Sequence, residues 1–100
     1  MNLPDLLQKV REEALNKTDL ESLYTEFLNL YSHTELRIGE LEKREAMYLE
    51  NNREKPVAHS KRSWNAQNEG QELITLKRQS KVLEKQLSAV KHRIFSHVAY

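Results

Sequence analysis

Apolar side chains recur along two long stretches of the chain at alternating steps of three and four residues. The stripe of the first stretch consists of Leu20, Tyr24, Phe27, Tyr31, Thr34, Ile38 and Leu41. The stripe of the second stretch consists of Leu73, Leu76, Ser80, Leu83, Leu87, Val90 and Ile94. This spacing places the residues of each stripe on one face of an α-helix. The pattern therefore predicts two long helices, over residues 19–52 and 69–98.

A shorter leucine-rich segment precedes the first long helix. Asn2 followed by Pro4 is typical of a helix start, and the apolar spacing continues toward residue 16. We therefore expect a short amphipathic helix over residues 3–16. Thr18 and Glu21 have the spacing of a capping box, which predicts that the next helix begins at residue 19.

The segment between the two long helices lacks the heptad pattern. Pro56 disfavours a helical conformation for Lys55, and Asn, Ser and Gln accumulate around it. We expect a basic loop over residues 53–68. Asn68 and Gln71 then have capping-box spacing, which marks the start of the last helix.

Together these elements predict a single all-α domain, with a short N-terminal helix and a long antiparallel, coiled-coil-like helical hairpin. The apolar stripes are too wide for two helices to cover, which predicts self-association into a homo-oligomer. The expected interface consists of Leu20, Tyr24, Phe27, Tyr31, Ile38, Leu41, Leu73, Leu76, Leu83, Leu87, Val90 and Ile94. The alternative is a monomeric three-helix bundle that residues 3–16 close.

Charge is divided between the two halves of the chain. Residues 1–50 carry 6 Lys/Arg and 11 Asp/Glu, whereas residues 51–100 carry 10 Lys/Arg and 4 Glu, which gives net charges of −5 and +6. Such asymmetry is typical of proteins that contact nucleic acid or another polyanion. In the alternative interpretation, the acidic half folds back on the basic half and neutralises it.

Composition argues against several classes of protein. Cysteine is absent, and no phosphate-binding loop or nucleophile motif occurs, so we expect no enzyme activity and no cofactor. His92 and His97 are five residues apart rather than four, so we expect no metal site. No signal peptide or membrane-spanning run is present, which predicts a cytoplasmic protein without a membrane partner, in the host cytoplasm if it is virus-encoded.

A basic cluster surrounds the only tryptophan. Cations and an aromatic ring suit single-stranded nucleic acid, since cations neutralise phosphates while the ring stacks on an unpaired base. The candidate binding residues in this segment are Arg53, Lys55, Lys61, Arg62 and Trp64. Lys77, Arg78 and Lys81 extend the positive surface along the last helix. Alternatively, Trp64 folds back to cover the open end of the hairpin.

Two stretches of the chain resemble a family of phage proteins. They are Glu42-Lys43-Arg44-Glu45-Ala46-Met47-Tyr48 and the closing segment from Leu83 to Phe95, and they follow the leading segment Leu3-Pro4-Asp5-Leu6-Leu7. The layout is similar to that of the UvsY-type recombination mediators of tailed phages. The resemblance implies a helical, ring-forming protein that binds single-stranded DNA and helps to load a recombinase in place of a single-strand-binding protein. It also adds Lys43 and Arg44 to the expected DNA-binding residues.

These observations lead to two functional hypotheses. In the first, the chain is a non-enzymatic oligomer that binds single-stranded nucleic acid as an accessory in recombination or replication. Its partners would be further copies of itself, single-stranded DNA, and a recombinase or single-strand-binding protein. In the second, it is a coiled-coil module for protein–protein contact, with a structural, scaffolding or inhibitory role, and its charges fix register and partner choice.

Overall fold

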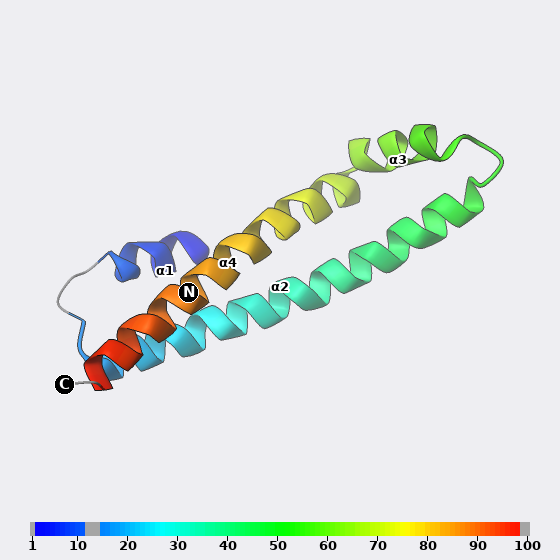
Figure 1. Cartoon of the computed structure of the whole chain (residues 1–100). Helices are drawn as coiled ribbons and strands as arrows, with labels where there is room; N and C mark the ends of the chain where they lie inside the picture. Colours follow the sequence, from blue (N-terminus) through cyan, green and yellow to red (C-terminus); the bar gives the residue numbers. More distant parts are fainter. Residues whose placement is uncertain (1, 12–14, 99–100) are drawn as a thin grey trace. The chain divides into compact units, whose positions relative to one another are not determined.

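The computed structural model describes residues 2–11 and 15–98, with side chains described as far as residue 96. Its helices are α1 (Leu3–Val10), α2 (Lys17–Asn51), α3 (Val57–Ala66) and α4 (Asn68–Val98) (Figure 1). No strand occurs among the described residues. α2 and α4 pack as an antiparallel hairpin, so the all-α prediction is confirmed.

The chain divides into two compact units. Unit 1 consists of Met1–His33 and Lys81–Tyr100, and unit 2 consists of Thr34–Ser80. Each long helix contributes one part to each unit, since α2 passes through residue 33 and α4 through residue 81. The two units have separate hydrophobic cores, and each is described by itself below.

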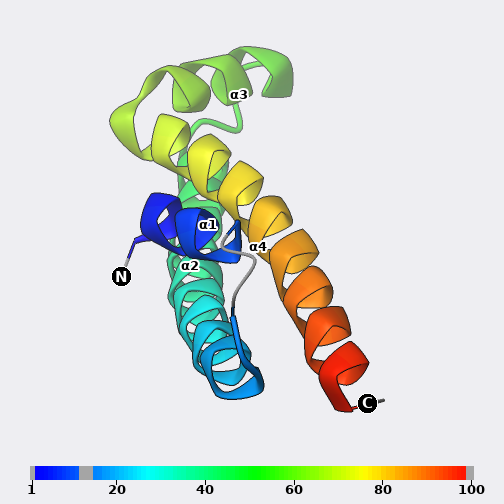
Figure 2. The same ribbon diagram turned by 90° about the vertical axis from the view of Figure 1, so that its left-hand side faces the viewer.

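Unit 1 is a three-helix arrangement, because α1 packs against α2 and α4 (Figure 2). The fully enclosed residues of its core are Leu6, Leu20, Leu23, Phe27, Leu83 and Val90. Leu6 of α1 is completely buried among them. The tyrosine hydroxyl of Tyr31 donates to Glu84 Oε1 at 3.0 Å on the polar border of this core. α1 therefore covers an apolar face that α2 and α4 alone would leave open.

The short first helix ends earlier than the predicted residue 16. Asn2 Oδ1 accepts from the Asp5 backbone N–H at 3.0 Å and caps α1, as the Asn2-Pro4 pattern predicts. At the other end, Arg93 Nη1 donates to the carbonyl of Val10 at 2.9 Å. Arg11 is a turn residue, and residues 12–14 lie outside the described part of the chain.

α2 begins two residues before the predicted position, because a different pair of side chains caps it. Asn16 Oδ1 accepts from Asp19 N at 2.8 Å, and Asp19 Oδ2 accepts from Asn16 N at 3.3 Å. This reciprocal pair has the geometry of a capping box, with Asn and Asp in place of the expected Thr18 and Glu21. The pair explains why α2 begins at Lys17.

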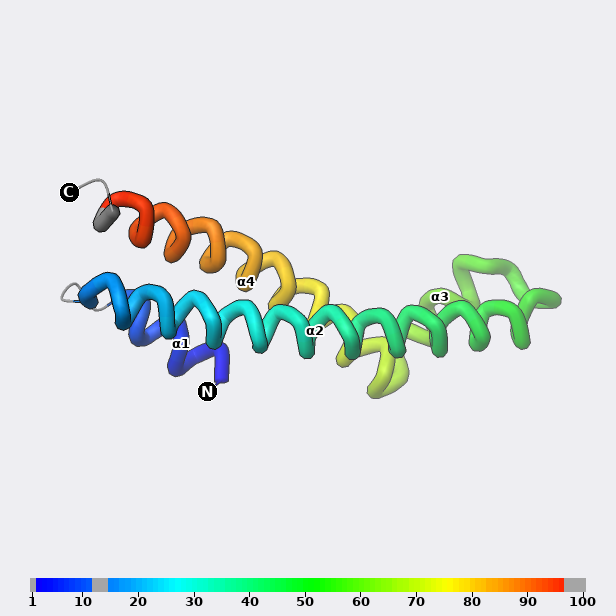
Figure 3. Tube along the Cα trace, turned by 90° about the horizontal axis from the view of Figure 1, so that it is seen from below, coloured from blue at the N-terminus to red at the C-terminus, as the bar shows by residue number. Residues whose placement is uncertain are grey.

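Unit 2 contains a helix where the sequence predicts a loop. Residues 57–66 of the expected loop form α3, which folds back beside the end of α2 (Figure 3). Pro56 directly precedes this helix, a position that tolerates proline because the first helical N–H groups have no intrahelical acceptor. Ser60 and Trp64 lie four residues apart and are both buried, so they anchor α3 by one face.

The turn between α3 and α4 depends on Gly70. A Cβ atom at this position would lie 2.0 Å from the Trp64 carbonyl oxygen, so only glycine fits. The expected capping bond between Asn68 and Gln71 is replaced by another contact, in which Gln71 Nε2 donates to the Asn65 carbonyl. The first turn of α4 is therefore held by the end of α3 and not by its own cap.

The residues expected to form an oligomer interface lie inside the chain instead. Leu20, Phe27, Ile38, Leu41, Leu73, Leu83 and Val90 are buried, and Tyr24, Tyr31, Leu76, Leu87 and Ile94 pack against these cores. The stripes are wide because each unit buries them against a further helix or against the partner helix. The width of the stripes thus gives no argument for self-association.

We predict opposite effects of alanine at the two glycines. Gly70→Ala should lower the free energy of unfolding by about 1–3 kcal/mol, since the new methyl group must displace backbone. Gly39→Ala is the matched control: its new methyl group would meet no atom of another side chain or element within 4 Å, so it should raise that free energy by up to about 1 kcal/mol through helix propensity. Urea unfolding followed by Trp64 fluorescence measures both, and a Gly70 variant as stable as the parent contradicts the packing described.

Candidate nucleic-acid interface

Two ion pairs join α2 and α4 in unit 2. The Arg37 guanidinium donates to both carboxylate oxygens of Glu72, at 2.7 and 3.0 Å, and also to Glu40 at 3.0 Å. Arg44 pairs with Glu69. In both pairs the cation comes from the acidic half of the chain and the anion from the basic half. The α2–α4 contact therefore uses cations of the acidic half and glutamates of the basic half. Most of the cations of α4 form no ion pair within the described residues.

The fork of Arg37 on Glu72 is the contact that shifts a pKa. Its hydrogen bonds, with smaller contributions from the positive charges of Arg37 and Arg44, hold the pKa of Glu72 below its ordinary value despite partial desolvation. The pKa of Arg37 is correspondingly raised, mainly by the hydrogen bonds to Glu72 and Glu40. Both side chains are partly exposed, so the pair is a moderate contribution to stability.

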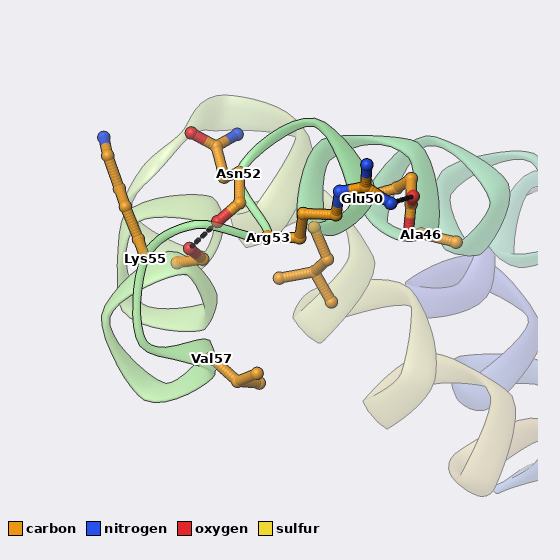
Figure 4. Close-up of a pocket in the computed structure, with 8 residues that line it drawn as sticks. Ala46, Glu50, Asn52, Arg53, Lys55 and Val57 are labelled. Carbon is orange, nitrogen blue, oxygen red and sulfur yellow. Dashed lines mark hydrogen bonds and ion pairs between the residues drawn. The ribbon is translucent and has the colours of Figure 1, made fainter.

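Two of the four cations predicted near Trp64 are already paired. Arg53 Nη1 contacts Glu50 at 3.1 Å, and Lys61 Nζ contacts Glu45 at 2.7 Å. Arg62 donates to the carbonyl of Ala58, at 3.4 Å. Lys55 extends away from its neighbours and has no ion pair within the described residues (Figure 4).

The cations of α4 are in a different situation. Lys77, Arg78 and Lys81 are exposed, and none forms an ion pair within residues 2–11 and 15–98. Lys85, four residues beyond Lys81, is also exposed and unpaired in that part of the chain. The same holds for Lys43 of α2, whereas its neighbour Arg44 is paired with Glu69. α4 thus presents a run of exposed cations that form no ion pair within the described residues.

Trp64 does not lie at the surface. Its side chain is 2% exposed, and its ring lies against Tyr48, with 5.8 Å between the ring centroids. In this structure the ring is therefore not accessible for a base to stack on, and its burial against Tyr48 agrees with the alternative in which Trp64 folds back to cover the open end of the hairpin. The indole Nε1 has no hydrogen-bond acceptor among the described residues.

Phe95 is the aromatic residue that the pattern failed to single out. It is 60% exposed, and Lys91 Nζ lies 5.9 Å from the centre of its ring. Among the described aromatic side chains it is the exposed one. Its position outside the main stripe of the last helix was the available signal, since Ile94 already fills the neighbouring stripe position.

The turn between α2 and α3 encloses a shallow pocket of about 410 Å³ (Figure 4). Ala46, Leu49 and Val57 line its apolar part, and Arg53 lies at its edge, turned toward Glu50. Val57 is 74% exposed. The pocket therefore offers an apolar contact.

No group of three or more His, Cys, Asp or Glu side chains is arranged to hold a metal ion in the part of the chain that is described. Within the same part, no helix combines the length and apolar character needed to cross a membrane. Comparison with protein-family models, curated proteins and solved structures finds no match to this chain.

Glu72 provides a pH-dependent test of the α2–α4 contact. Because its folded-state pKa is lowered, the ionised carboxylate stabilises the fold above the unfolded value of about 4.3, and this stabilisation is lost as the pH falls through the folded value. Glu72→Gln should lower the thermal midpoint near neutral pH, and its effect should diminish as the pH falls below the unfolded value and the carboxylate is protonated. Thermal unfolding of both proteins across this range measures the difference, and a pH-independent difference contradicts the role of the ion pair.

Proposed function

We propose that this chain is a non-enzymatic helical protein that binds single-stranded nucleic acid as an accessory in recombination or replication. The supporting observation is that the ion pairs between α2 and α4 join arginines of α2 to glutamates of α4. Of the cations of the basic half, Arg53 and Lys61 are bound to carboxylates, whereas Lys77, Arg78 and Lys81 stay available within the described structure. The interpretation in which the acidic half neutralises the basic half accounts for the Arg53–Glu50 and Lys61–Glu45 pairs, but it also predicts acidic partners for Lys77, Arg78 and Lys81.

In unit 2, phosphate groups contact Lys77 and Arg78 of α4. These neighbouring side chains are exposed, so binding a phosphate breaks no ion pair within the described residues. Each phosphate that a cation neutralises releases condensed counterions, which makes binding depend steeply on salt. Lys55 and Arg62 add positive charge near α3 without forming internal ion pairs in the described residues.

In unit 1, Phe95 replaces Trp64 as the stacking platform. An exposed ring accepts a base on its face with no movement of the fold, and Lys91 lies close enough to contact the adjoining phosphate. Stacking on an aromatic side chain is sequence-tolerant, because every base has a π-face. This arrangement suits a protein that coats a strand without reading its sequence.

The role in recombination or replication comes from the resemblance to UvsY-type mediators. The matching stretch around Lys43 and Arg44 has one cation without an ion pair in the described residues, Lys43, and one that pairs with Glu69. We therefore assign Lys43 to DNA contact and Arg44 to the α2–α4 contact. A recombinase or single-strand-binding protein would be the protein partner.

The phosphate contacts predict a specific change in salt dependence. Lys77→Ala/Arg78→Ala should weaken binding to a labelled oligo-dT strand and flatten the slope of log affinity against log salt by up to about 1.4, at about 0.7 per phosphate contact. Fluorescence anisotropy at several salt concentrations measures both quantities.

The control for this experiment removes two lysines of unit 1. Lys9→Ala/Lys17→Ala changes the net charge equally, but Lys17 already contacts Glu21 at 3.9 Å and neither residue belongs to the proposed site. It should leave the salt slope near that of the parent. Equal slopes for all three proteins would remove α4 from the site, and absence of binding at low salt would contradict nucleic-acid binding altogether.

Stacking on Phe95 should affect affinity without changing the salt slope. Phe95→Leu keeps an apolar side chain and removes the π-face, so it should weaken binding by about 1–3 kcal/mol for one stacked base. Trp64→Phe serves as the comparison, since Trp64 is buried and should contribute little to binding. The same anisotropy titration distinguishes them, and an unchanged affinity of the Phe95 variant would exclude it as a platform.

A second candidate function is a protein-interaction module without a nucleic-acid role. Exposed apolar side chains favour it: Leu36, Met47 and Val57 are 68%, 66% and 74% exposed. In that case the available cations of α4 guide association with an acidic protein surface. The anisotropy titration separates the two functions, because only the first requires affinity for oligo-dT at low salt.

A further inference from the structure

A hollow of about 270 Å³ lies in unit 2, where the C-terminal part of α2 meets the end of α3 and the start of α4. Ligand sites in proteins begin at about 300 Å³, so the hollow suits a single ring system. Apolar and aromatic groups form part of its lining. Met47 is 66% exposed there, whereas Tyr48 and Trp64 pack against each other. Because a thioether makes favourable contacts with aromatic rings, Met47 offers a contact to the face of a flat ligand.

The two charged side chains at the hollow are paired with each other. Arg44 of α2 binds Glu69 of α4, and the pair has no net charge. A phosphate would have to break this pair in order to bind Arg44, whereas an uncharged ring leaves it intact. The hollow therefore suits a neutral ring better than an anion.

Two carboxamides line the hollow from different segments. Asn51 belongs to the last turn of α2 and Gln67 to the turn between α3 and α4, and both are exposed. Neither carboxamide forms a hydrogen bond with another described residue. A carboxamide offers an acceptor oxygen beside a donor NH₂ group, and adenine is the base that Asn and Gln bind through two hydrogen bonds. Adenine can satisfy two carboxamides at once, because its 6-amino group donates one hydrogen beside N7 and the other beside N1.

Lys43 connects the hollow to the proposed DNA contacts. Lys43, Met47 and Asn51 are spaced four residues apart, so they follow one another along one face of α2. Each step is about one helical turn, or about 5.4 Å along the axis. Lys43 is exposed and has no ion pair within the described residues. A strand whose phosphate lies on Lys43 can therefore place the adjoining base on Met47, next to Asn51.

We propose that this hollow binds one unpaired adenine of the strand, with the base against Met47 and its two edges paired with Asn51 and Gln67. The proposal rests on the proposed function and deepens it. Phosphate contacts and stacking on Phe95 tolerate any sequence, whereas the hollow distinguishes bases by their hydrogen-bonding edges. Each copy of the chain thereby gains a preference for strands that contain adenine.

The test compares labelled strands of equal length that differ only in chosen bases. The first is oligo-dT, the second carries deoxyadenosine at regular intervals, and the third carries 7-deaza-deoxyadenosine at the same positions. By fluorescence anisotropy, the parent protein should bind the adenine strand about 5-fold or more tightly than oligo-dT, as expected for one bidentate pair. The 7-deaza strand keeps the ring system but lacks the N7 acceptor, so it should bind less tightly than the adenine strand.

Variants assign the preference to the hollow. Asn51→Ala/Gln67→Ala should remove the preference for adenine and leave the affinity for oligo-dT unchanged. Gln8→Ala/Asn29→Ala is the matched control, since it removes two exposed carboxamides of unit 1, and it should keep the preference. Far-ultraviolet circular dichroism should show that both variants are folded.

The outcomes separate this proposal from the function on which it rests. If the parent binds the adenine strand and oligo-dT equally, or if the preference survives in the Asn51→Ala/Gln67→Ala variant, the adenine site is overturned and the proposed function stands. If the parent binds no strand even at low salt, both are overturned.

Discussion

The fork of Arg37 on Glu72 is the interaction on which the arrangement of unit 2 depends. It is a two-bonded polar contact between α2 and α4, and it sets their register beside the core of Ile38, Leu41 and Leu73. A planar guanidinium that meets a carboxylate through two parallel bonds tolerates little sliding. A shift of one helical turn would separate this pair, although the apolar stripes, which recur every three to four residues, would still face each other.

That register also determines the electrostatic surface. Arg37 and Arg44 occupy Glu72 and Glu69 of α4. The lysines of α4 form no ion pair within the described residues, and the glutamates of α2 receive no cation from α4 there. The two helices therefore keep opposite outward charges although the chain as a whole is nearly neutral. The proposed nucleic-acid contact follows from this one choice of partners.

The spacing of apolar residues was sufficient to predict the two long helices. The heptad stripes give the two long helices within about two residues, because an apolar face must be buried wherever the helix runs. The pattern misses α3 because Pro56 suggests a break, although a proline can directly precede a helix. The spacing of Ser60 and Trp64 was its signal, but four residues of spacing are too few to establish a period. The width of the stripes, from which we expect self-association, is accounted for in unit 1 by Leu6, which covers them from within the chain.

The candidate site could be predicted from the sequence less completely than the fold. The cations themselves can be read from the chain, but whether each is free depends on the register of α2 against α4, which the contact between Arg37 and Glu72 sets. Lys61 and Lys77 look alike in sequence, yet one contacts Glu45 and the other has no acidic partner in the described structure. Packing likewise determines which aromatic side chain is exposed. The basic cluster around Trp64 suggests that residue as the stacking platform, whereas Phe95 is the exposed one.

The division of the chain into a contiguous unit and a discontinuous one has a consequence for folding. Unit 2 consists of consecutive residues, so its contacts close short loops and can form early. Unit 1 joins two segments that the whole of unit 2 separates, and its core cannot close until α4 has reached Leu83 and Val90. During synthesis, the side chains of Leu6, Leu20 and Phe27 therefore stay exposed until α4 has formed. Folding of unit 2 brings the two distant segments together and shortens the time for which these side chains are exposed.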